Sequence, residues 1–265
     1  MSKILVAGPW TGEFGYELFK WQGYIRKVVE EGGYDEVIVS SRPGNELLYR
    51  DFCTTYMPVE ADINPCEGRF NGNKENQSPH DYFKGIPYLR AIDPGFKITD
   101  EPQSFIPYGV LDRSFPYDVV IHARGIAVGD RGNMVPTHAD MKESRNWGID
   151  KWTELTHRLT SSGMHVCCIG SPTASWLIPG AADHRGVPLD MLADILVASS
   201  IIVGPSSGPL HFATLCGCKQ AVWGSPHLEA RYKELWNPFG TPVNFMAVDD
   251  NWDPDVMDIE ALILG

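Results

Sequence analysis

The chain has 265 residues, of which 43% are hydrophobic and 21% are charged, a composition typical of a globular protein with one or two cores. Its net charge of −12 argues against broad non-specific binding to nucleic acid but leaves room for a local basic groove. No apolar run approaches the ~20 residues of a membrane-spanning helix. The chain enters a predicted strand at Lys3 without a signal-peptide pattern. We therefore expect a cytoplasmic protein without a membrane span.

The six cysteines do not form the pattern of a zinc site. Cys167 and Cys168 are neighbours in a predicted strand and therefore point to opposite faces of a sheet. Cys216 and Cys218 are closer together than two ligands of a typical zinc loop. We expect the thiols to be reduced and buried, as in a cytoplasmic protein.

Residues 1–53 are predicted to open a doubly wound parallel sheet. In chain order the pattern predicts a strand at 3–8, a glycine-rich turn at 8–15, a helix at 16–31, a strand at 35–40 and a helix at 44–53. Such alternation is typical of a parallel α/β sheet. The glycines of the turn lack the Gly-x-Gly-x-x-Gly spacing of a dinucleotide site, so no NAD cofactor is inferred.

Residues 54–116 hold many Pro, Gly and Asn residues and few periodic runs. The segment 64–79 is predicted to be a long loop near an acceptor. Arg69 and Lys74 are candidate contacts to an anionic acceptor, with plain solvated surface as the alternative. A last strand is expected at 105–107 and a linker at 111–116. The amino-terminal domain is therefore predicted to span residues 1–115.

The second domain, residues 116–265, is predicted to start with a central strand at 117–125. His122 and Arg124 alternate to one face near its carboxyl end, where ligands bind in open α/β sheets. Arg124 is a candidate diphosphate partner, because a guanidinium binds phosphate oxygens in pairs. The polar loop at 126–142 is expected to close over a donor.

The alternation continues to the end of the chain. The pattern predicts strands at 164–170, 201–203 and 220–224 and helices at 188–196 and 253–264. Gly170 and Ser171 form the turn after the first of these strands, where a nucleotide base or ribose would approach.

The strongest local signal is the strand–turn–helix between Ile201 and Thr214. Ser206 and Ser207 are residue types that begin helices, and Gly208 permits close approach to the backbone. The first turn of a helix offers unpaired amides and a positive dipole end, which favour phosphate. An ordinary serine-capped connection is the alternative.

Residues 203–213, Val-Gly-Pro-Ser-Ser-Gly-Pro-Leu-His-Phe-Ala, resemble the donor-site segment of the lipopolysaccharide heptosyltransferases, glycosyltransferase family 9. That segment typically reads Gly-Asn-Asp-Ser-Gly-Pro-Met-His-Leu-Ala. The resemblance implies that the donor diphosphate contacts Ser206, Ser207, Gly208, Pro209, Leu210 and His211. Ser206 replaces the family's Asp, which is associated with the donor sugar, so the resemblance implies the diphosphate contacts but does not identify the sugar as heptose.

The turn at 8–15 is similar to the Gly-Pro-Ser-Trp-Val-Gly-Asp loop of the same family, whose acidic residue is the proposed catalytic base. Gly12 and Glu13 match its end, which implies that Glu13 deprotonates the acceptor hydroxyl and that Gly12 lies at the donor. Glu17, one helical turn further on, is the second candidate for the base. A solvated carboxylate near a helix amino terminus is the alternative for Glu13.

Residues 144–155 resemble a third family segment, Lys-x-Trp-Pro-x-x-x-Trp-x-x-Leu. Arg145 stands where the family's lysine contacts the donor phosphate. Trp147 and Trp152 are expected to pack a helix onto the sheet. A family turn that corresponds to the start of the 188–196 helix lies against the base, which implies Asp190 and Leu192 as base contacts.

Together these segments imply a GT-B-like fold, α/β, with two Rossmann-like domains facing across a cleft. The implied activity is transfer of a sugar from a nucleotide-diphosphate sugar to an acceptor hydroxyl, by default on a cell-surface glycan. The alternatives are transfer to a hydroxymethylated DNA base, as in some phage enzymes, a GT-B-type sugar epimerase, and a non-catalytic nucleotide-sugar-binding subunit. No Asp-x-Asp motif lies beside the donor segment, so neither a metal nor a cofactor is expected.

Overall fold

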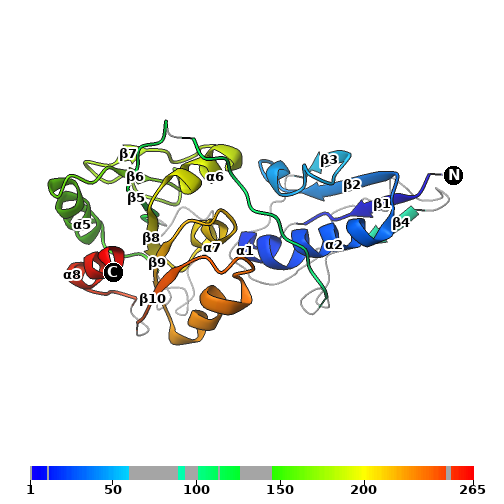
Figure 1. Ribbon diagram of the computed structural model, residues 1–265. Helices are drawn as coiled ribbons and strands as arrows, with labels where there is room; N and C mark the ends of the chain where they lie inside the picture. The colour runs from blue at the N-terminus through cyan, green and yellow to red at the C-terminus, as the bar shows by residue number, and fades with distance from the viewer. Residues whose placement is uncertain are drawn as a thin grey trace, which may run out of the picture. The chain divides into compact units, whose positions relative to one another are not determined.

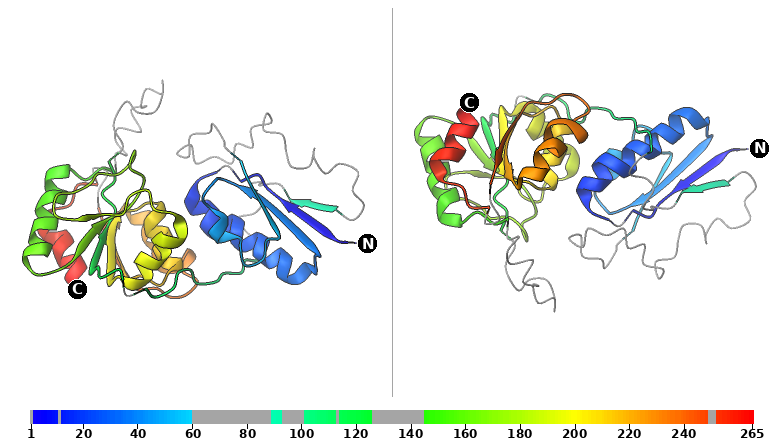
Figure 2. Two further views of the ribbon diagram at one scale, coloured as in Figure 1. Left: turned by 90° about the horizontal axis from the view of Figure 1, so that it is seen from above. Right: turned by 90° about the horizontal axis from the view of Figure 1, so that it is seen from below.

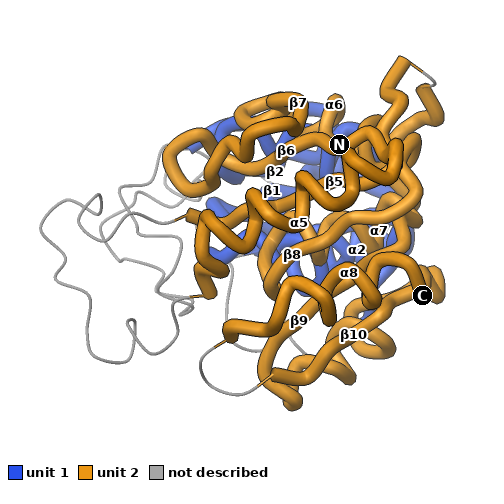
Figure 3. Tube along the Cα trace, turned by 90° about the vertical axis from the view of Figure 1, so that its left-hand side faces the viewer, with its two compact units in different colours: residues 1–106 blue, residues 107–265 orange. Residues whose placement is uncertain are grey.

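The computed structural model describes residues 2–10, 12–59, 89–92, 101–112, 114–125, 145–248 and 252–265. The chain divides into two compact units, Met1–Ile106 and Pro107–Gly265 (Figure 3). The sequence predicts the domain boundary between residues 115 and 116, later in the chain than the boundary between residues 106 and 107 in the structure. The intervening segment belongs to the second unit because the Tyr108 ring packs on Phe212 at 5.8 Å, and its amide donates to the carbonyl of Leu215 at 2.9 Å.

The first unit is built on a parallel sheet, as the sequence predicts. Its described strands are β1 (Ile4–Ala7), β2 (Glu36–Ser41), β3 (Thr55–Pro58) and β4 (Leu89–Ile92), in the order β3-β2-β1-β4. All three pairings are parallel. Because β2 and β4 flank β1, the turn after β1 leaves the sheet where the chain changes winding direction, which is where ligands bind in such sheets.

One long helical run packs along a face of this sheet (Figure 2). It consists of α1 (Phe14–Tyr16), a π-helical turn η1 (Glu17–Trp21) and α2 (Gln22–Gly32). The helix predicted at 16–31 is therefore confirmed. It ends at Gly33, whose left-handed backbone (φ 56°) suits the residue after a helix.

Two expectations for the first unit are wrong. The segment 44–53 forms only a 3₁₀ turn, η2 (Glu46–Leu48). The Leu48 carbonyl accepts a hydrogen bond from the buried Arg26 side chain at 3.1 Å, in the place of a helical backbone partner. Residues 105–107 form no strand: the amide of Ser104 donates to Gly23 on α2, and Phe105 packs on Phe19 at 5.8 Å. Both segments contact the long helical run, and the local sequence pattern does not indicate these contacts.

The second unit contains a larger sheet in which every described pairing is parallel. Its strands are β5 (Val119–Ile121), β6 (Val166–Cys168), β7 (Ala182–Asp183), β8 (Ile201–Pro205), β9 (Gln220–Gly224) and β10 (Val243–Ala247). The order is β10-β9-β8-β5-β6-β7. This is the doubly wound order of nucleotide-binding sheets, with the change of winding direction between β5 and β8.

Helices cover both faces of this sheet (Figures 1 and 2). The helices α5 (Ile149–Ser161) and α8 (Val256–Leu264) lie on one face, and α6 (Leu189–Ala198) and α7 (Gly208–Leu215) lie on the other. A 3₁₀ turn, η4 (Pro226–Leu228), and a π-helical turn, η5 (Arg231–Leu235), follow β9. The predicted strands and helices of this half are confirmed, except that the first strand stops at Ile121. Beyond it the chain turns to pair with Ser175 at Arg124.

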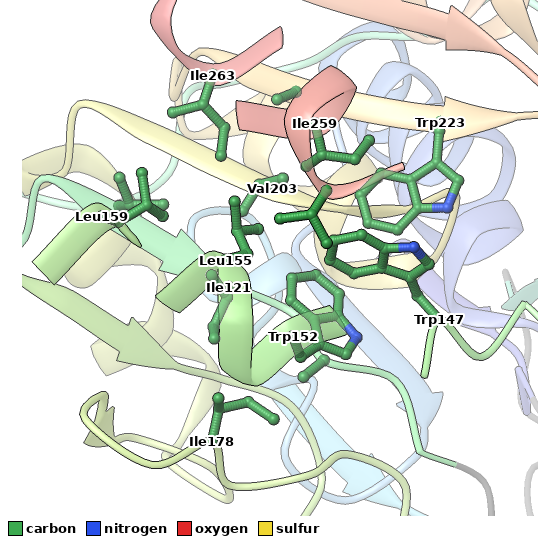
Figure 4. Close-up of a cluster of buried hydrophobic side chains, with 14 of the residues drawn as sticks. Ile121, Trp147, Trp152, Leu155, Leu159, Ile178, Val203, Trp223, Ile259 and Ile263 are labelled. Atoms are coloured by element: carbon green, nitrogen blue, oxygen red, sulfur yellow. The ribbon is translucent and has the colours of Figure 1, made fainter. Parts of the chain in front are cut away.

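Three tryptophans join α5 to the sheet (Figure 4). The ring of Trp147 lies 4.8 Å from that of Trp152 and 5.3 Å from that of Trp223, and all three side chains are fully buried. The predicted packing role of Trp147 and Trp152 is therefore confirmed. Truncating such a side chain to alanine costs about 3–5 kcal/mol.

Of the cysteines in the described ranges, Cys53 is half-buried, and Cys167, Cys168, Cys216 and Cys218 are buried; all are free thiols. Burial raises the pKa of the Cys168 thiol to about 11. Among the helices of the described segments, none is both long enough and apolar enough to cross a membrane.

Candidate functional site

The candidate site of the second unit lies at the carboxyl edge of its sheet, where β5 and β8 are neighbours. His122 follows β5, and Ser206 and Ser207 follow β8. The amide of His122 donates to the carbonyl of Val203 at 3.0 Å, which fixes the two strand ends side by side. This is the point of the sheet at which the chain changes winding direction, and nucleotides bind there in doubly wound folds.

Ser207 begins α7 but does not cap it. Its backbone is extended (φ −164°, ψ 170°), as expected for an N-cap residue, yet its side chain makes no hydrogen bond to the helix amides. The hydroxyl lies instead 2.9 Å from Nδ1 of His122. The sequence predicts the start of this helix but not the direction of the serine.

The first turn of α7 consequently keeps donors for another acceptor. The amide of Ser207 donates to the hydroxyl of Tyr232 at 3.1 Å, and Pro209 has no N–H. Helix geometry leaves the amides of Gly208 and Leu210 without an intrahelical acceptor. Gly208 and Pro209 are half-buried, whereas the Leu210 side chain lies in the core.

Tyr232, on η5, binds the serine pair from a second side, which no sequence pattern indicates. Its hydroxyl donates to Ser206 Oγ at 3.0 Å while accepting from the Ser207 amide. Burial raises the pKa of the Tyr232 hydroxyl to about 12, so it stays a neutral donor. Only the tertiary fold brings η5 to this turn, because Tyr232 carries no motif of its own.

Arginines supply positive charge around the turn. Arg145 donates from Nη1 to the carbonyl of Ser206 at 3.2 Å, and its guanidinium lies 5.1 Å from the centre of the Trp252 ring. Arg231 lies over Trp236 at 4.6 Å, and its charge helps to lower the pKa of Tyr232 against the effect of burial. Arg124 is half-buried two residues after His122. An anion at this edge would meet amides, hydroxyls and guanidinium groups.

His211 faces Tyr232 on η5 and Trp236, the residue that follows η5. Its ring stacks on Tyr232 at 4.2 Å and meets Trp236 edge-on at 4.7 Å. Burial, followed by the charges of Arg231 and Arg145, holds the pKa of His211 well below its usual range. His211 is therefore a neutral imidazole packed against aromatic rings, and its contact with a donor stays a prediction.

Of the predicted base and ribose contacts, Gly170 and Ser171 follow β6, and Asp190 and Leu192 lie near the start of α6. Gly170 adopts φ +115°, and a Cβ there would lie 2.9 Å from Cδ2 of His122, so the glycine leaves space for the imidazole. Ser171 is exposed, and its hydroxyl pairs with that of Thr173 at 2.8 Å. Asp190 is exposed at the start of α6 and accepts from the Met191 amide, while Leu192 is half-buried. No ligand contact follows from these positions alone.

The Ser207–His122 pair is not an activated nucleophile. Burial, followed by the charge of Arg124, lowers the pKa of His122 to about 3, so the imidazole is a poor base at neutral pH. Gly204, Ser206 and Gly208 have the Gly-x-Ser-x-Gly spacing of hydrolase elbows. In the described part of the chain, however, Trp252 is the one non-glycine residue with positive φ, so Ser206 lacks the strained backbone of such an elbow.

In the first unit, the turn after β1 is fixed to both neighbouring strands. The Gly8 amide donates to Ile92 at 3.0 Å, and the Trp10 amide donates to Ser40 at 2.9 Å. Glu13 is the half-buried N-cap residue of α1, and its carbonyl accepts from the Glu17 amide. Gly12 lies against the Trp10 ring. Glu13 therefore lies at the start of the helical run, directly after described residues that are hydrogen-bonded to both neighbouring strands.

Glu17 has a different environment. Its carboxylate is fully buried and accepts hydrogen bonds from the Ser41 hydroxyl, from Tyr49 at 2.6 Å and from Asn45 at 2.7 Å. Burial raises the pKa of Glu17 to about 7, and these donors together with the charge of Arg42 limit the rise. A carboxylate so enclosed does not reach an acceptor, so the geometry favours Glu13 over Glu17 as the base.

Arg69, Lys74 and the loop 126–142 lie outside the residues that the structure describes. Within the described ranges, no group of three or more His, Cys, Asp or Glu side chains is arranged to hold a metal ion.

No protein-family model matches the sequence, and a search of curated proteins finds no significant relative. Solved structures do match. The ADP-heptose lipopolysaccharide heptosyltransferase II of E. coli aligns over 99% of this chain and 98% of its own, with a TM-score of 0.63 and 13% identity. A glycosyl transferase family 9 protein from Veillonella parvula covers 99% and 97%, with a TM-score of 0.58 and 10% identity.

The E. coli heptosyltransferase WaaC, solved with ADP-2-deoxy-2-fluoro heptose, aligns over 99% of both chains with a TM-score of 0.57 and 10% identity. These likenesses confirm the predicted GT-B-like fold. Because the identities are so low, they show the fold alone, and the function has to be argued from this chain's own residues.

Proposed function

We propose that the protein is a glycosyltransferase that moves a sugar from a nucleotide-diphosphate sugar to an acceptor hydroxyl, with a cell-surface glycan as the acceptor class. The observation that carries the proposal is the amino end of α7. Its N-cap serine is turned away to His122, its first-turn amides lack an intrahelical acceptor, and Arg145 stands beside it. The GT-B-like fold supports the proposal, because ligands of doubly wound sheets bind at the carboxyl edge, where this helix begins.

The chemistry separates into two parts. The acceptor oxygen attacks the anomeric carbon and passes its proton to Glu13, while the bond from that carbon to the diphosphate oxygen breaks. The diphosphate leaves with the electron pair and gains negative charge. The α7 amides, the Ser207 hydroxyl and Arg145 stabilise that charge as preorganised donors. Metal independence and a cytoplasmic location belong to the proposal as predictions from the sequence.

The test is a thermal-shift panel of ADP, GDP, UDP, CDP and dTDP, followed by their sugar conjugates, each with and without Mg²⁺. A ligand that binds the folded protein raises its melting midpoint by mass action. We expect one nucleotide to stand out and to do so without Mg²⁺. If none shifts the midpoint, α7 is an ordinary helix start and the donor-site proposal fails.

A further inference from the structure

The contact between His122 and Ser207 has a consequence for the donor site beyond packing. Ser207 occupies the N-cap position, from which a serine hydroxyl ordinarily accepts from the second or third helix amide. At 2.9 Å from Nδ1 of His122, its hydroxyl is held in another direction. The histidine thereby competes with the helix for the serine.

The histidine itself has little freedom. It is buried, its amide is bonded to Val203 on β8, and Gly170 leaves no side chain between its ring edge and the neighbouring turn. Burial and the charge of Arg124 lower its pKa to about 3, so the ring carries one N–H. In a neutral imidazole, Nδ1 either donates to Ser207 Oγ or accepts from it.

The two tautomers differ in what they present to an anion. If Nδ1 accepted the serine proton, Ser207 would turn oxygen lone pairs toward a phosphate. If Nδ1–H donates, the serine proton is available to a phosphate oxygen, and the serine oxygen is kept off the α7 amides. An anion at α7 favours the second arrangement.

We propose that His122 is a positioning residue of the donor site, an inference that rests on the proposed function. Its Nδ1–H donates to Ser207 Oγ, which keeps the Leu210 amide uncapped and directs the serine proton to a diphosphate oxygen. The histidine acts through the serine and does not itself contact the donor.

The test is calorimetric titration of inorganic pyrophosphate and of the five nucleoside diphosphates into the wild type and variants. His122→Ala and Ser207→Ala should each weaken binding about tenfold, the effect of one hydrogen bond to a charged group. The double variant should bind no more weakly than His122→Ala, because a serine released from His122 caps the Leu210 amide of α7 and its removal frees that amide again. If the affinity losses of the two single variants multiply in the double variant, the inference is wrong.

A conservative pair covers the case in which His122→Ala does not fold. Asparagine carries an amide nitrogen near the position of Nδ1, whereas glutamine places its amide near that of Nε2. We expect His122→Asn to bind within about threefold of the wild type and His122→Gln to lose about tenfold. Equal losses in the two variants would contradict the role of Nδ1.

The outcomes separate this inference from the function on which it rests. If the wild type binds none of the probes, the donor site fails and the inference fails with it. If the wild type binds and every His122 variant binds equally well, the donor site stands and the inference alone is overturned.

Discussion

Both units gather hydrogen-bond donors at the carboxyl edge of a parallel sheet, but they satisfy them differently. In the first unit, Ser41, Asn45 and Tyr49 donate to the chain's own carboxylate, Glu17. In the second, the described contacts of Arg145 are a carbonyl and an aromatic ring, and the N-cap serine is turned from α7. Donors that meet the chain's own carboxyl group are occupied within the fold, whereas donors without such a partner are open to an anion from outside.

The comparison also separates the two carboxylates of the first unit. Glu17 is enclosed by donors, whereas Glu13 stands half-buried on the turn after β1. Replacing either one by the isosteric amide should therefore affect different properties.

Glu13→Gln should lower turnover about 10²–10⁴-fold, the usual contribution of a general base, and leave donor affinity near the wild-type value. Turnover is measured with the nucleotide sugar found in the panel, and affinity by calorimetry. Glu31→Gln, an exposed carboxylate near the far end of the same helical run, is the control. Unchanged turnover in Glu13→Gln would exclude Glu13 as the base. A wild-type protein that binds the donor but shows no turnover would favour a non-catalytic binding subunit.

Glu17→Gln should change the pH dependence of stability rather than affinity. The folded-state pKa of about 7 lies above the ordinary value of 4.5, so the stability that protonation contributes is complete below pH 4.5 and is lost as pH rises through 7. At 1.36 kcal/mol per pKa unit, the contribution is about 3 kcal/mol. The variant lacks this titration.

Urea unfolding of both proteins at pH 5 and pH 8 measures the difference. The stability advantage of the wild type over Glu17→Gln should be larger at pH 5 than at pH 8. An advantage that is equal at both values would mean that Glu17 does not titrate in this interval.

Arg145→Ala should weaken nucleoside-diphosphate binding about 10–100-fold, as expected for a lost hydrogen bond to a charged group, and Arg145→Lys should recover part of it. The matched control is Arg158→Ala, on α5, whose guanidinium pairs with Glu260 at 2.6 Å. Affinity is measured by calorimetry at fixed ionic strength. Equal losses in the Arg145 and Arg158 alanine variants would show a general effect of charge rather than a contact at α7.

Tyr232→Phe should destabilise the protein by about 1 kcal/mol and weaken donor binding by a few fold, because the serine turn loses one donor and one acceptor. Tyr117→Phe, whose hydroxyl pairs with His184 at 2.7 Å, is a control for the loss of a tyrosine hydroxyl elsewhere in the unit. Urea unfolding gives the stability and calorimetry the affinity. Binding that falls equally in both variants would show that Tyr232 has no specific role at the turn.

The sequence alone determined the elements with strong local periodicity. The strand and helix around Ser207, the first strand and its long helix, and the tryptophan pair Trp147 and Trp152 all follow from apolar spacing, because a buried face of fixed period leaves few alternatives. The resemblance of three short segments also identified the GT-B-like fold. The short edge strands β3 and β4 were missed, since a few residues carry too little pattern.

The interactions of the site side chains depend on the tertiary structure. Ser207 has the sequence of a helix cap, yet His122, from another strand, takes its hydroxyl. Glu17 reads as a second candidate base, yet Ser41, Asn45 and Tyr49 enclose it. Tyr232 belongs to no recognisable motif, yet its hydroxyl donates a hydrogen bond to Ser206 in the serine turn. A hydrogen bond between segments far apart in the chain depends on how the sheet is wound, and local propensity carries no information about such a partner.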